Sequence, residues 1–506
     1  MKKLAALLMA LVMVLSVCSF ASAEEPFVIT VTVAFYTEDQ PDDENNPIVK
    51  YIEEALNVDF QFKWVSSGSA AETFNYDMAS TEQPMIYVIS SGVTSNVNYI
   101  DMCQEGAFWD LTDYIQASDL FREELTTPSC LAASSVDGRN YLFPLITSGA
   151  RLGLLHRQDW LEKLGLEEPT TIETFKAMVE AFATQDPDGN GINDTIGFAY
   201  CDDADEEIDY AGFNTIVAWL GGPVNWGLQD GKLMPYFFFD EYFEALDLFK
   251  WMYENGYMNS DFAINTNKHA PVANNVSGSM FTSATAVLSN DYDNLNNIVG
   301  AGNWTLETQQ ELYKADGTRV MSSTVTAGSL GGILIPKYSV KTEEELQKIL
   351  DVFTAIRTEG ELDKVLTIGI EGIHYTVENG EIVVTDEQST LLATDALPIA
   401  SIVPRRIVSK DYGAPLTEKA KLNKQVMEKN TENEQYATVD LSMGYMDTDT
   451  RNLQLSIATI ISDARVQYMM GKIDKDGFIA ARDNWLAQGG QEIIDSVNAA
   501  YAEANK

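Results

Sequence analysis

The chain has 506 residues, 45% of them hydrophobic and 10% aromatic, and its 76 acidic residues outnumber 33 basic residues for a net charge of −43. This apolar content excludes a disordered acidic chain, and the length is too great for one ordinary core, so two or three domains are expected. So negative a field repels nucleic acid and anionic lipid surfaces, which argues against both as partners.

The first residues have the order of a secretory signal peptide. A pair of lysines precedes an apolar run from Leu4 to Val17, and Ala21-Ser22-Ala23 forms a small-x-small cleavage site. This order predicts that residues 1–23 are removed and that the protein is secreted or held at the cell surface, outside the cytoplasmic membrane. The apolar run is too short for a membrane span, and no later stretch is long enough to be one.

Cys18 offers an alternative end to this signal, because a cysteine directly after a short apolar box can carry a lipid anchor. Val17 stands where a small residue is usual, so cleavage after Ala23 is favoured over an anchor at Cys18. The chain has three other cysteines, Cys103, Cys130 and Cys201. They have neither the number of a disulfide framework nor the paired spacing of a metal site.

The N-terminal part alternates between predicted strands and helices. Strands are predicted at Phe27–Tyr36, Val58–Trp64 and Met85–Ile89, and a helix at Pro47–Leu56. This alternation indicates an open, largely parallel sheet, and such sheets bind ligands at the carboxyl ends of their strands. The residues at those ends, Tyr36, Ser90 and Ser91, are therefore candidate ligand-binding residues.

The rest of the chain is mainly helical. Thr170 with Glu173 predicts a capping box, and the helix behind it has an apolar face that includes Phe175, Met178, Val179 and Phe182. Further helices are predicted at Tyr242–Tyr253, Leu453–Met470, Asp476–Gln488 and Glu492–Tyr501, and strands at Gly331–Pro336 and Tyr375–Val384. Because repeats and long linkers are absent from the sequence, we expect lobes that are interleaved by crossing segments.

The strongest local signal is an acidic loop with oxygen ligands at positions 1, 3, 5 and 9 and a main-chain carbonyl at position 7: Asp186, Asp188, Asn190, Asp194 and Ile192. An EF-hand-type loop wraps calcium with this spacing, and Gly191 at position 6 permits its sharp turn. Gly197 replaces the usual glutamate of position 12, so a sixth ligand must come from elsewhere or from water. The alternative is an acidic turn without metal. Bound calcium would hold the loop together and take no part in chemistry.

The segment Leu154–Leu166, with Pro169-Thr170-Thr171 and the acidic loop after it, resembles the family 1 extracellular solute-binding proteins, the substrate-binding proteins of ABC transporters. It is most similar to the long, lipoprotein-type branch of Gram-positive bacteria, which includes alginate- and oligosaccharide-binding receptors. Further motifs follow in the family's order: Asp230-Gly231-Lys232, Met252–Gly256, Gly369–Tyr375, Gly471–Ile473 and Gly489–Tyr501. Together they span nearly the whole chain after the signal.

This resemblance implies an α/β, two-lobed fold of the periplasmic-binding-protein type (type II), with interleaved lobes and extra C-terminal helices. We expect residues 24–147 and about 280–345 in lobe 1, and residues 148–279 and about 346–506 in lobe 2. The resemblance also implies a monomer that binds a mono- or oligosaccharide, closes about a hinge and delivers the sugar to the permease subunits of an ABC importer. The calcium ligands carry over onto the acidic loop, but Thr195 stands where relatives often have a further acidic ligand.

Sugar sites combine flat aromatic side chains with carboxylates and amides. Trp226 is the first candidate because it lies among loop residues, although it could instead pack onto its own lobe. The polar-aromatic cluster Asp291, Tyr292 and Asp293 is the second, and Trp304 the third.

Three functions compete for this sequence. The receptor, which is not an enzyme, is favoured by the resemblance over a secreted glycoside hydrolase or polysaccharide lyase. The absence of an H-E-x-x-H or G-x-S-x-G motif counts only mildly against the enzyme. With 76 acidic residues, the carboxylate pair of a glycosidase stays open as an alternative. A surface adhesin without an importer is the third.

Overall fold

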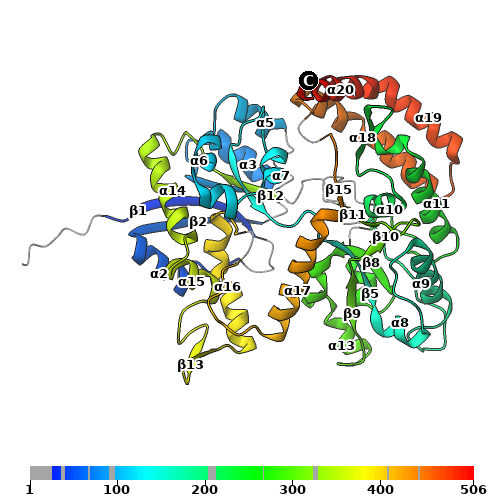
Figure 1. Cartoon of the computed structure of the whole chain (residues 1–506), viewed down its shortest axis with the longest axis horizontal. Coiled ribbons are helices and arrows are strands. Elements are labelled where there is room, and N and C mark those ends of the chain that lie inside the picture. Colours follow the sequence, from blue (N-terminus) through cyan, green and yellow to red (C-terminus); the bar gives the residue numbers. More distant parts are fainter. Residues whose placement is uncertain are drawn as a thin grey trace, which may run out of the picture.

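The computed structural model describes residues 25–35, 40–66, 69–90, 97–202, 212–265, 267–322, 329–406, 409–442 and 445–505. Two bodies lie side by side and are joined by segments in the middle (Figure 1). We call them the first lobe, built on the sheet that contains β1, and the second lobe, built around β5. Each has its own hydrophobic cluster, which confirms the expected two-lobed α/β fold.

The first lobe contains a five-stranded sheet in the order β2-β1-β3-β12-β4. Its strands are β1 (Phe27–Phe35), β2 (Val58–Ser66), β3 (Ile86–Ser90), β4 (Leu142–Ile146) and β12 (Ser329–Leu334). β1 is parallel to β2 and β3, whereas β12 runs antiparallel to both β3 and β4. The predicted largely parallel sheet is confirmed, with one strand of opposite direction inserted from far along the chain.

Helices pack on both sides of this sheet (Figure 1). They are α2 (Pro47–Leu56), α3 (Ala70–Ala79), α5 (Val97–Gln104), α6 (Thr112–Ala117), η2 (Leu120–Glu124), α7 (Pro128–Ala133), α14 (Glu343–Arg357), α15 (Glu361–Ile368) and α16 (Asp386–Ile402). The bounds predicted for α2 are confirmed, because the Asn46 side chain caps it by accepting from the N–H groups of Ile48 and Val49. A hairpin of β13 (Thr376–Glu378) and β14 (Glu381–Val383) precedes α16.

The second lobe contains several small sheets. β5 (Leu152–Arg157) lies between β8 (Ser279–Ser283) and β9 (Leu306–Gln309), and β11 (Arg319–Ser322) lies between β10 (Leu312–Tyr313) and β15 (Ala437–Thr438). β6 (Trp226–Gln229) and β7 (Lys232–Pro235) form a hairpin. The helical elements in the N-terminal part of this lobe are α8 (Gln158–Leu164), α9 (Ile172–Thr184), α10 (Phe213–Leu220), η3 (Tyr236–Phe238) and α11 (Asp240–Glu254). Those that follow are α12 (His269–Ala273), η4 (Ala284–Leu288), η5 (Asn290–Tyr292) and α13 (Asn294–Ile298).

The capping box of α9 lies one residue later than predicted. Thr171, and not Thr170, is the N-cap, and its partner at the third helical position is Thr174 instead of Glu173. Thr171 N–H donates to Thr174 Oγ1 at 3.0 Å, so a threonine hydroxyl takes the role that a carboxylate usually has. The predicted apolar face is confirmed, since Phe175, Met178, Val179 and Phe182 are all buried.

Three helices close the chain on the outer side of the second lobe: α18 (Thr448–Met469), α19 (Lys475–Trp485) and α20 (Gln491–Ala504) (Figure 1). They follow α17 (Glu418–Asn433) and η6 (Glu434–Tyr436), and η7 (Leu486–Gly490) joins α19 to α20. Their apolar faces extend the core around Trp160 and Trp219. None of the helices in the described ranges is long and apolar enough to cross a bilayer.

The segments after residue 279 divide between the two lobes according to the elements that they pair and pack with. The strands from β8 to β11 pair and pack with the second lobe, although residues from about 280 were expected in lobe 1. The helices from α14 to α16 pack on the first sheet, although residues from about 346 were expected in lobe 2. The reason is that β12 is the element that returns to the first sheet, and the helices that follow it along the chain cover that sheet.

Gly331 lies where only a glycine fits. Its φ is +110°, and an added Cβ would stand 2.0 Å from the carbonyl oxygen of Ile89 on the neighbouring strand. We expect Gly331→Ala to lower the free energy of unfolding by about 3 kcal/mol, since backbone strain and a steric clash add. Gly317→Ala is the control, because Gly317 also has a positive φ but open space around it, and about 1 kcal/mol is expected. Urea unfolding measures both, and equal losses would contradict the clash.

Candidate functional site

The edge of the first sheet that faces the second lobe is built from the carboxyl ends of parallel strands. β1, β2, β3 and β4 all end at this edge, and the antiparallel β12 begins there, with Ser329 opposite Ile146 and Gly331 opposite Ser90. The chain therefore leaves the sheet after Ile146 and returns at Ser329 on the same side. Open α/β sheets bind ligands at this edge.

The second lobe presents a matching edge. β5 begins there at Leu152, paired with Ser283 at the end of β8, and β9 ends beside them at Gln309. η4 continues from β8 and is half-buried over most of its length. The junction of the lobes thus lies between two rows of strand ends, linked by the short crossing from Ile146 to Leu152.

Of the residues predicted at the first edge, Ser90 is described by the structure, whereas Tyr36 and Ser91 lie outside the described residues. Ser90 is half-buried at the end of β3. It lines a small cavity together with Thr32, Ala34, Val65, Ala70, Tyr87, Val88 and Ile89. The cavity therefore lies at the carboxyl ends of three neighbouring strands.

Trp226 is placed in the core of the second lobe, with 4% of its surface exposed. It begins β6, and its carbonyl oxygen accepts from the N–H of Leu441 at 3.3 Å. Asp440, beside this contact, accepts from the N–H and the hydroxyl of Ser442, both at 2.7 Å, and from the side chain of Asn225. Burial raises the pKa of Asp440 to about 6, and these hydrogen bonds oppose the rise.

The predicted polar-aromatic cluster and Trp304 are brought together on another part of the second lobe. Tyr292 is 1% exposed and its hydroxyl lies 2.8 Å from Nδ1 of His269, while Asp291 and Asp293 beside it are exposed. Tyr292 belongs to a small apolar cluster, and Trp304 packs against this cluster. Trp304 Nε1 donates to Asn296. The candidate residues thus lie in three separate places. Ser90 lies at the strand ends of the first sheet, Trp226 lies in the core of the second lobe, and the other four lie in or beside this cluster.

The acidic loop is organised by the amide of Asn190. Asn190 Nδ2 donates to Asp188 Oδ2 at 3.1 Å and to Asp194 Oδ1 at 3.0 Å, and Asn190 Oδ1 accepts from Ile192 N–H at 2.7 Å. Gly191 N–H donates to one oxygen of Asp186. Asp188, Asn190, Ile192 and Asp194 are therefore linked through the Asn190 amide, and Asp186 is held by the N–H of Gly191.

Two features of this loop are relevant to whether it binds a cation. Asp186 Oδ1 is buried without a hydrogen-bond partner, and burial raises the pKa of Asp188, with Asp194 and Asp186 adding to the rise. Both features mark uncompensated negative charge. Across the described part of the chain, however, no three acidic, histidine or cysteine side chains gather closely enough to form a ready metal cluster.

The loop is tied to the sheet of β5 through the half-buried Asn275 and the buried Arg157. Asn275 Nδ2 donates to Asp188 Oδ2 at 3.2 Å, and Asn275 Oδ1 accepts from Nη1 of Arg157, at the end of β5, at 2.5 Å. Thr195 is buried, and its hydroxyl donates to the carbonyl oxygen of Phe182 at 2.7 Å. Thr195 therefore points into the lobe and away from the other loop ligands.

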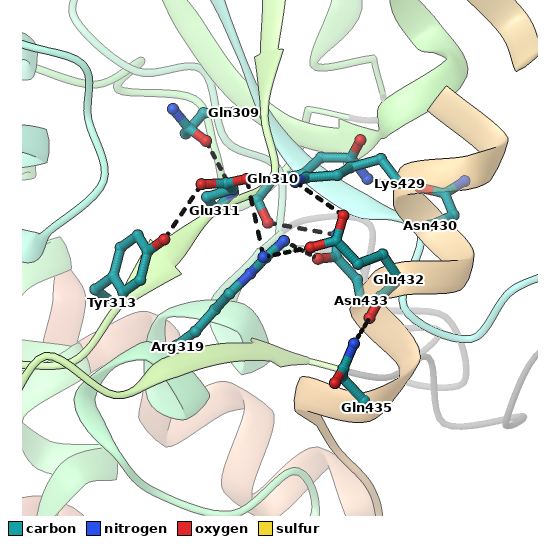
Figure 2. A network of polar contacts seen from close by, with 10 residues as sticks. All are labelled: Gln309, Gln310, Glu311, Tyr313, Arg319, Lys429, Asn430, Glu432, Asn433 and Gln435. Atoms are coloured by element: carbon teal, nitrogen blue, oxygen red, sulfur yellow. Dashed lines mark hydrogen bonds and ion pairs between the residues drawn. The ribbon is translucent and has the colours of Figure 1, made fainter. Parts of the chain in front are cut away.

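A polar network that sequence reasoning missed holds α17 against the second lobe (Figure 2). Arg319 Nη1 donates to Glu432 Oε1 at 2.7 Å, and its Nη2 donates to Asn433 Oδ1 at 2.5 Å. Lys429 pairs with Glu311, whose pKa is lowered chiefly by this contact. The partners lie more than a hundred residues apart in sequence, so local pattern carried no signal for them.

A sequence model described as bacterial extracellular solute-binding protein matches residues 39–354, more than half of the chain. The chain belongs to this family. It is 28% identical over 490 residues to the lipoprotein LipO of Bacillus subtilis (strain 168), with 94% of this chain and 92% of LipO covered. It is 27% identical to the polygalacturonan/rhamnogalacturonan-binding protein YtcQ of the same organism, with 90% and 88% covered.

Solved structures of solute-binding proteins share the fold. The ABC-transporter substrate-binding protein FusA of S. pneumoniae in complex with kestose has a TM-score of 0.67 at 19% identity, with 95% of this chain and 100% of FusA covered. An EF-hand mutant of FusA in complex with fructo-nystose has a TM-score of 0.63 at 18% identity, with the same coverage. The alginate-binding protein AlgQ2 without calcium ion has a TM-score of 0.65 at 17% identity, with 95% and 99% covered.

The raised pKa of Asp440 predicts a dependence of stability on pH. Because the folded pKa of about 6 lies above the ordinary 3.8, the contribution of this group is full below the ordinary pKa and is lost as the pH rises towards 6. Asp440→Asn removes this loss, so the variant should gain stability relative to the parent protein as the pH rises from about 4 to 7. Thermal melts across this range measure the difference, and a constant difference would contradict the prediction.

Proposed function

We propose that this solute-binding protein is a receptor that binds an oligosaccharide between its lobes, closes about the crossings and delivers the sugar to the permease subunits of an ABC importer. The observation that carries this proposal is the junction itself, where the carboxyl ends of β1 to β4 face the strand ends of the second lobe. A ligand that touches both rows stabilises the closed form over the open one.

The chemical class of the solute is argued from the relatives. YtcQ is named for polygalacturonan and rhamnogalacturonan, and FusA was solved with kestose, so both are sugar receptors. The family supports a protein that acts outside the cytoplasm, and the likeness to a lipoprotein keeps Cys18 as an alternative to cleavage after Ala23. We propose that the protein works as a monomer and without catalysis.

We propose that the moving lobes follow the two cores. Residues 25–146 with 329–403 would form one rigid body, and residues 152–322 with 437–505 the other, since these ranges supply the two main hydrophobic clusters. Ser90, with Tyr36 and Ser91, would contact the sugar from the first lobe. Trp226, Asp291, Tyr292, Asp293 and Trp304 stay proposed for the second lobe, although the burial of Trp226 and Tyr292 requires a local opening before either could stack on a sugar.

We also propose that the acidic loop holds a structural calcium ion. Asp186, Asp188, Asn190, Asp194 and the carbonyl of Ile192 would hold it, and the unpartnered Asp186 Oδ1 fits this role. Rotation of the Asn190 amide would turn its oxygen inward and let the carboxylates converge. Since Thr195 points into the lobe, water or a neighbouring side chain would complete the ligand set.

Calcium should stabilise the folded protein through this loop. The apparent melting temperature should rise on addition of millimolar calcium, since an ion at about a hundred times its dissociation constant contributes about 2.7 kcal/mol. Asp186→Asn should abolish the rise, whereas Asp483→Asn, an exposed change on α19, should retain it. A shift of the same size in both variants would place the ion elsewhere, and no shift in the parent protein would exclude the site.

Sugar binding is tested by isothermal titration with oligogalacturonides, kestose and alginate oligosaccharides, followed by chromatography of the mixture. A receptor should bind one of them at 1:1 stoichiometry and return it intact. X-ray scattering should show compaction with that sugar, because closure brings the lobes together. Release of shorter products would favour the glycoside hydrolase or lyase, and binding without compaction would contradict hinge closure.

A further inference from the structure

The C-terminal half of α17 is fastened to the second lobe on several sides. Asn430 and Asn433 are 1% and 0% exposed, and Gln310 Nε2 donates to Asn430 Oδ1 at 2.6 Å. Arg319 stands over the ring of Tyr436 at 4.5 Å while it donates to Glu432 and Asn433. Buried amides left without partners are costly, so this contact resists opening.

The first crossing is tied to the same helix end. Glu434 Oε1, directly after α17, accepts from the hydroxyl of Ser148 at 2.7 Å and from the N–H of Gly149 at 2.9 Å. Ser148 also donates to the carbonyl oxygen of Asn430 at 3.1 Å. The element that α17 packs against along its side is η4, also part of the second lobe. The arrangement around Arg319 is visible in Figure 2.

The chain before α17 is fastened instead to the first lobe. The hydroxyl of Tyr412 donates to Asp363 Oδ2 at 2.8 Å, and Arg406 pairs with Glu124 on η2. Nε of Arg357 donates to the carbonyl oxygen of Pro404 at 2.7 Å. Asp363 is 1% exposed, so this anchor is buried in the first lobe.

Between the two anchors lies a short, exposed stretch of chain, in which Gly413 N–H donates to the side chain of Asp411 at 2.8 Å. Gly413, Pro415 and Leu416 are exposed, and Gly413 has a φ of +76°. Thr417 then caps the helix by accepting from Ala420 N–H, and each residue from Lys421 to Gln425 is exposed. A helix resists bending because each turn is hydrogen-bonded to the next, whereas a Gly-x-Pro segment lacks such bonds.

The chain crosses between the lobes three times: between β4 and β5, between β11 and β12, and between α16 and α17. We propose that α17 moves as a rigid part of the second lobe, and that this third crossing bends at Gly413–Leu416, before the helix begins. The inference rests on the proposed movement of the lobes, but it assigns the bend to one short segment and leaves α17 outside it. The helix then acts as a lever whose N-terminal half swings with the second lobe relative to the first.

Pulsed EPR on the sugar-free chain from residue 24 tests this without any ligand. Spin labels are attached by Lys424→Cys on α17, Glu344→Cys on the first lobe and Asp240→Cys on the second, at side chains that are 63%, 83% and 92% exposed. The cysteines of the described chain are buried and stay unlabelled. The 344–424 and 344–240 distance distributions should be about twofold broader than the 240–424 distribution, because lobe motion enters only the first two.

A narrow 344–424 distribution with a broad 240–424 distribution would assign α17 to the first lobe and overturn the proposal. Three equally narrow distributions would also overturn it, because Gly413–Leu416 would then not bend. Sugar binding can fail or succeed without affecting either result.

Variants of the polar contacts that hold α17 to the second lobe provide a second test. Arg319→Ala should broaden the 240–424 distribution, and Glu432→Gln, which keeps a hydrogen-bond acceptor, should broaden it less. Lys250→Ala, which breaks a partly exposed pair with Glu254 on α11, is the control and should leave it unchanged. An unchanged distribution in Glu432→Gln and in folded Arg319→Ala would show that the network does not hold the helix.

Discussion

The structure depends on one constraint: the parallel strands of the first sheet end at a single edge, and the chain crosses to the second lobe from that edge. β4 leaves there after Ile146, and β12 can return to the sheet only in the antiparallel direction because it starts from the same side. Gly331 makes this return possible, since its positive φ and missing side chain let β12 lie against Ile89. The edge that supports the crossings is thus also the edge where a ligand can touch both lobes.

The second lobe has a large apolar core, and small networks of polar side chains lie around it. Trp160, Trp219 and Trp226 all belong to the core, so aromatic side chains that suit sugar stacking in principle serve packing here. The acidic loop lies at the margin and is tied through Asn275 and Arg157 to β5. A calcium ion in this loop would therefore stabilise the second lobe at a strand that begins at the junction.

The third crossing differs from the first because a whole helix takes part in it. On one side Tyr412 and Arg406 fasten the chain to the first lobe, and on the other Arg319 and Glu311 fasten α17 to the second. Exposed ion pairs contribute little by themselves, but Asn430 and Asn433 are buried, and their hydrogen bonds make separation costly. A crossing held firmly at both ends concentrates its motion in the few residues between the anchors.

Local sequence alone determined the helix Pro47–Leu56, the strands that open the first lobe, the buried face of α9, the acidic loop and the C-terminal helices, because caps, turns and apolar periodicity act over a few residues. The two-lobed fold was predicted from the family resemblance and not from local pattern. Only the tertiary structure decided that β12 lies between β3 and β4, that Trp226 is buried and that Arg319 meets Glu432. Each of these depends on partners that are distant in sequence, and the choice among such partners is made by packing and not by local pattern.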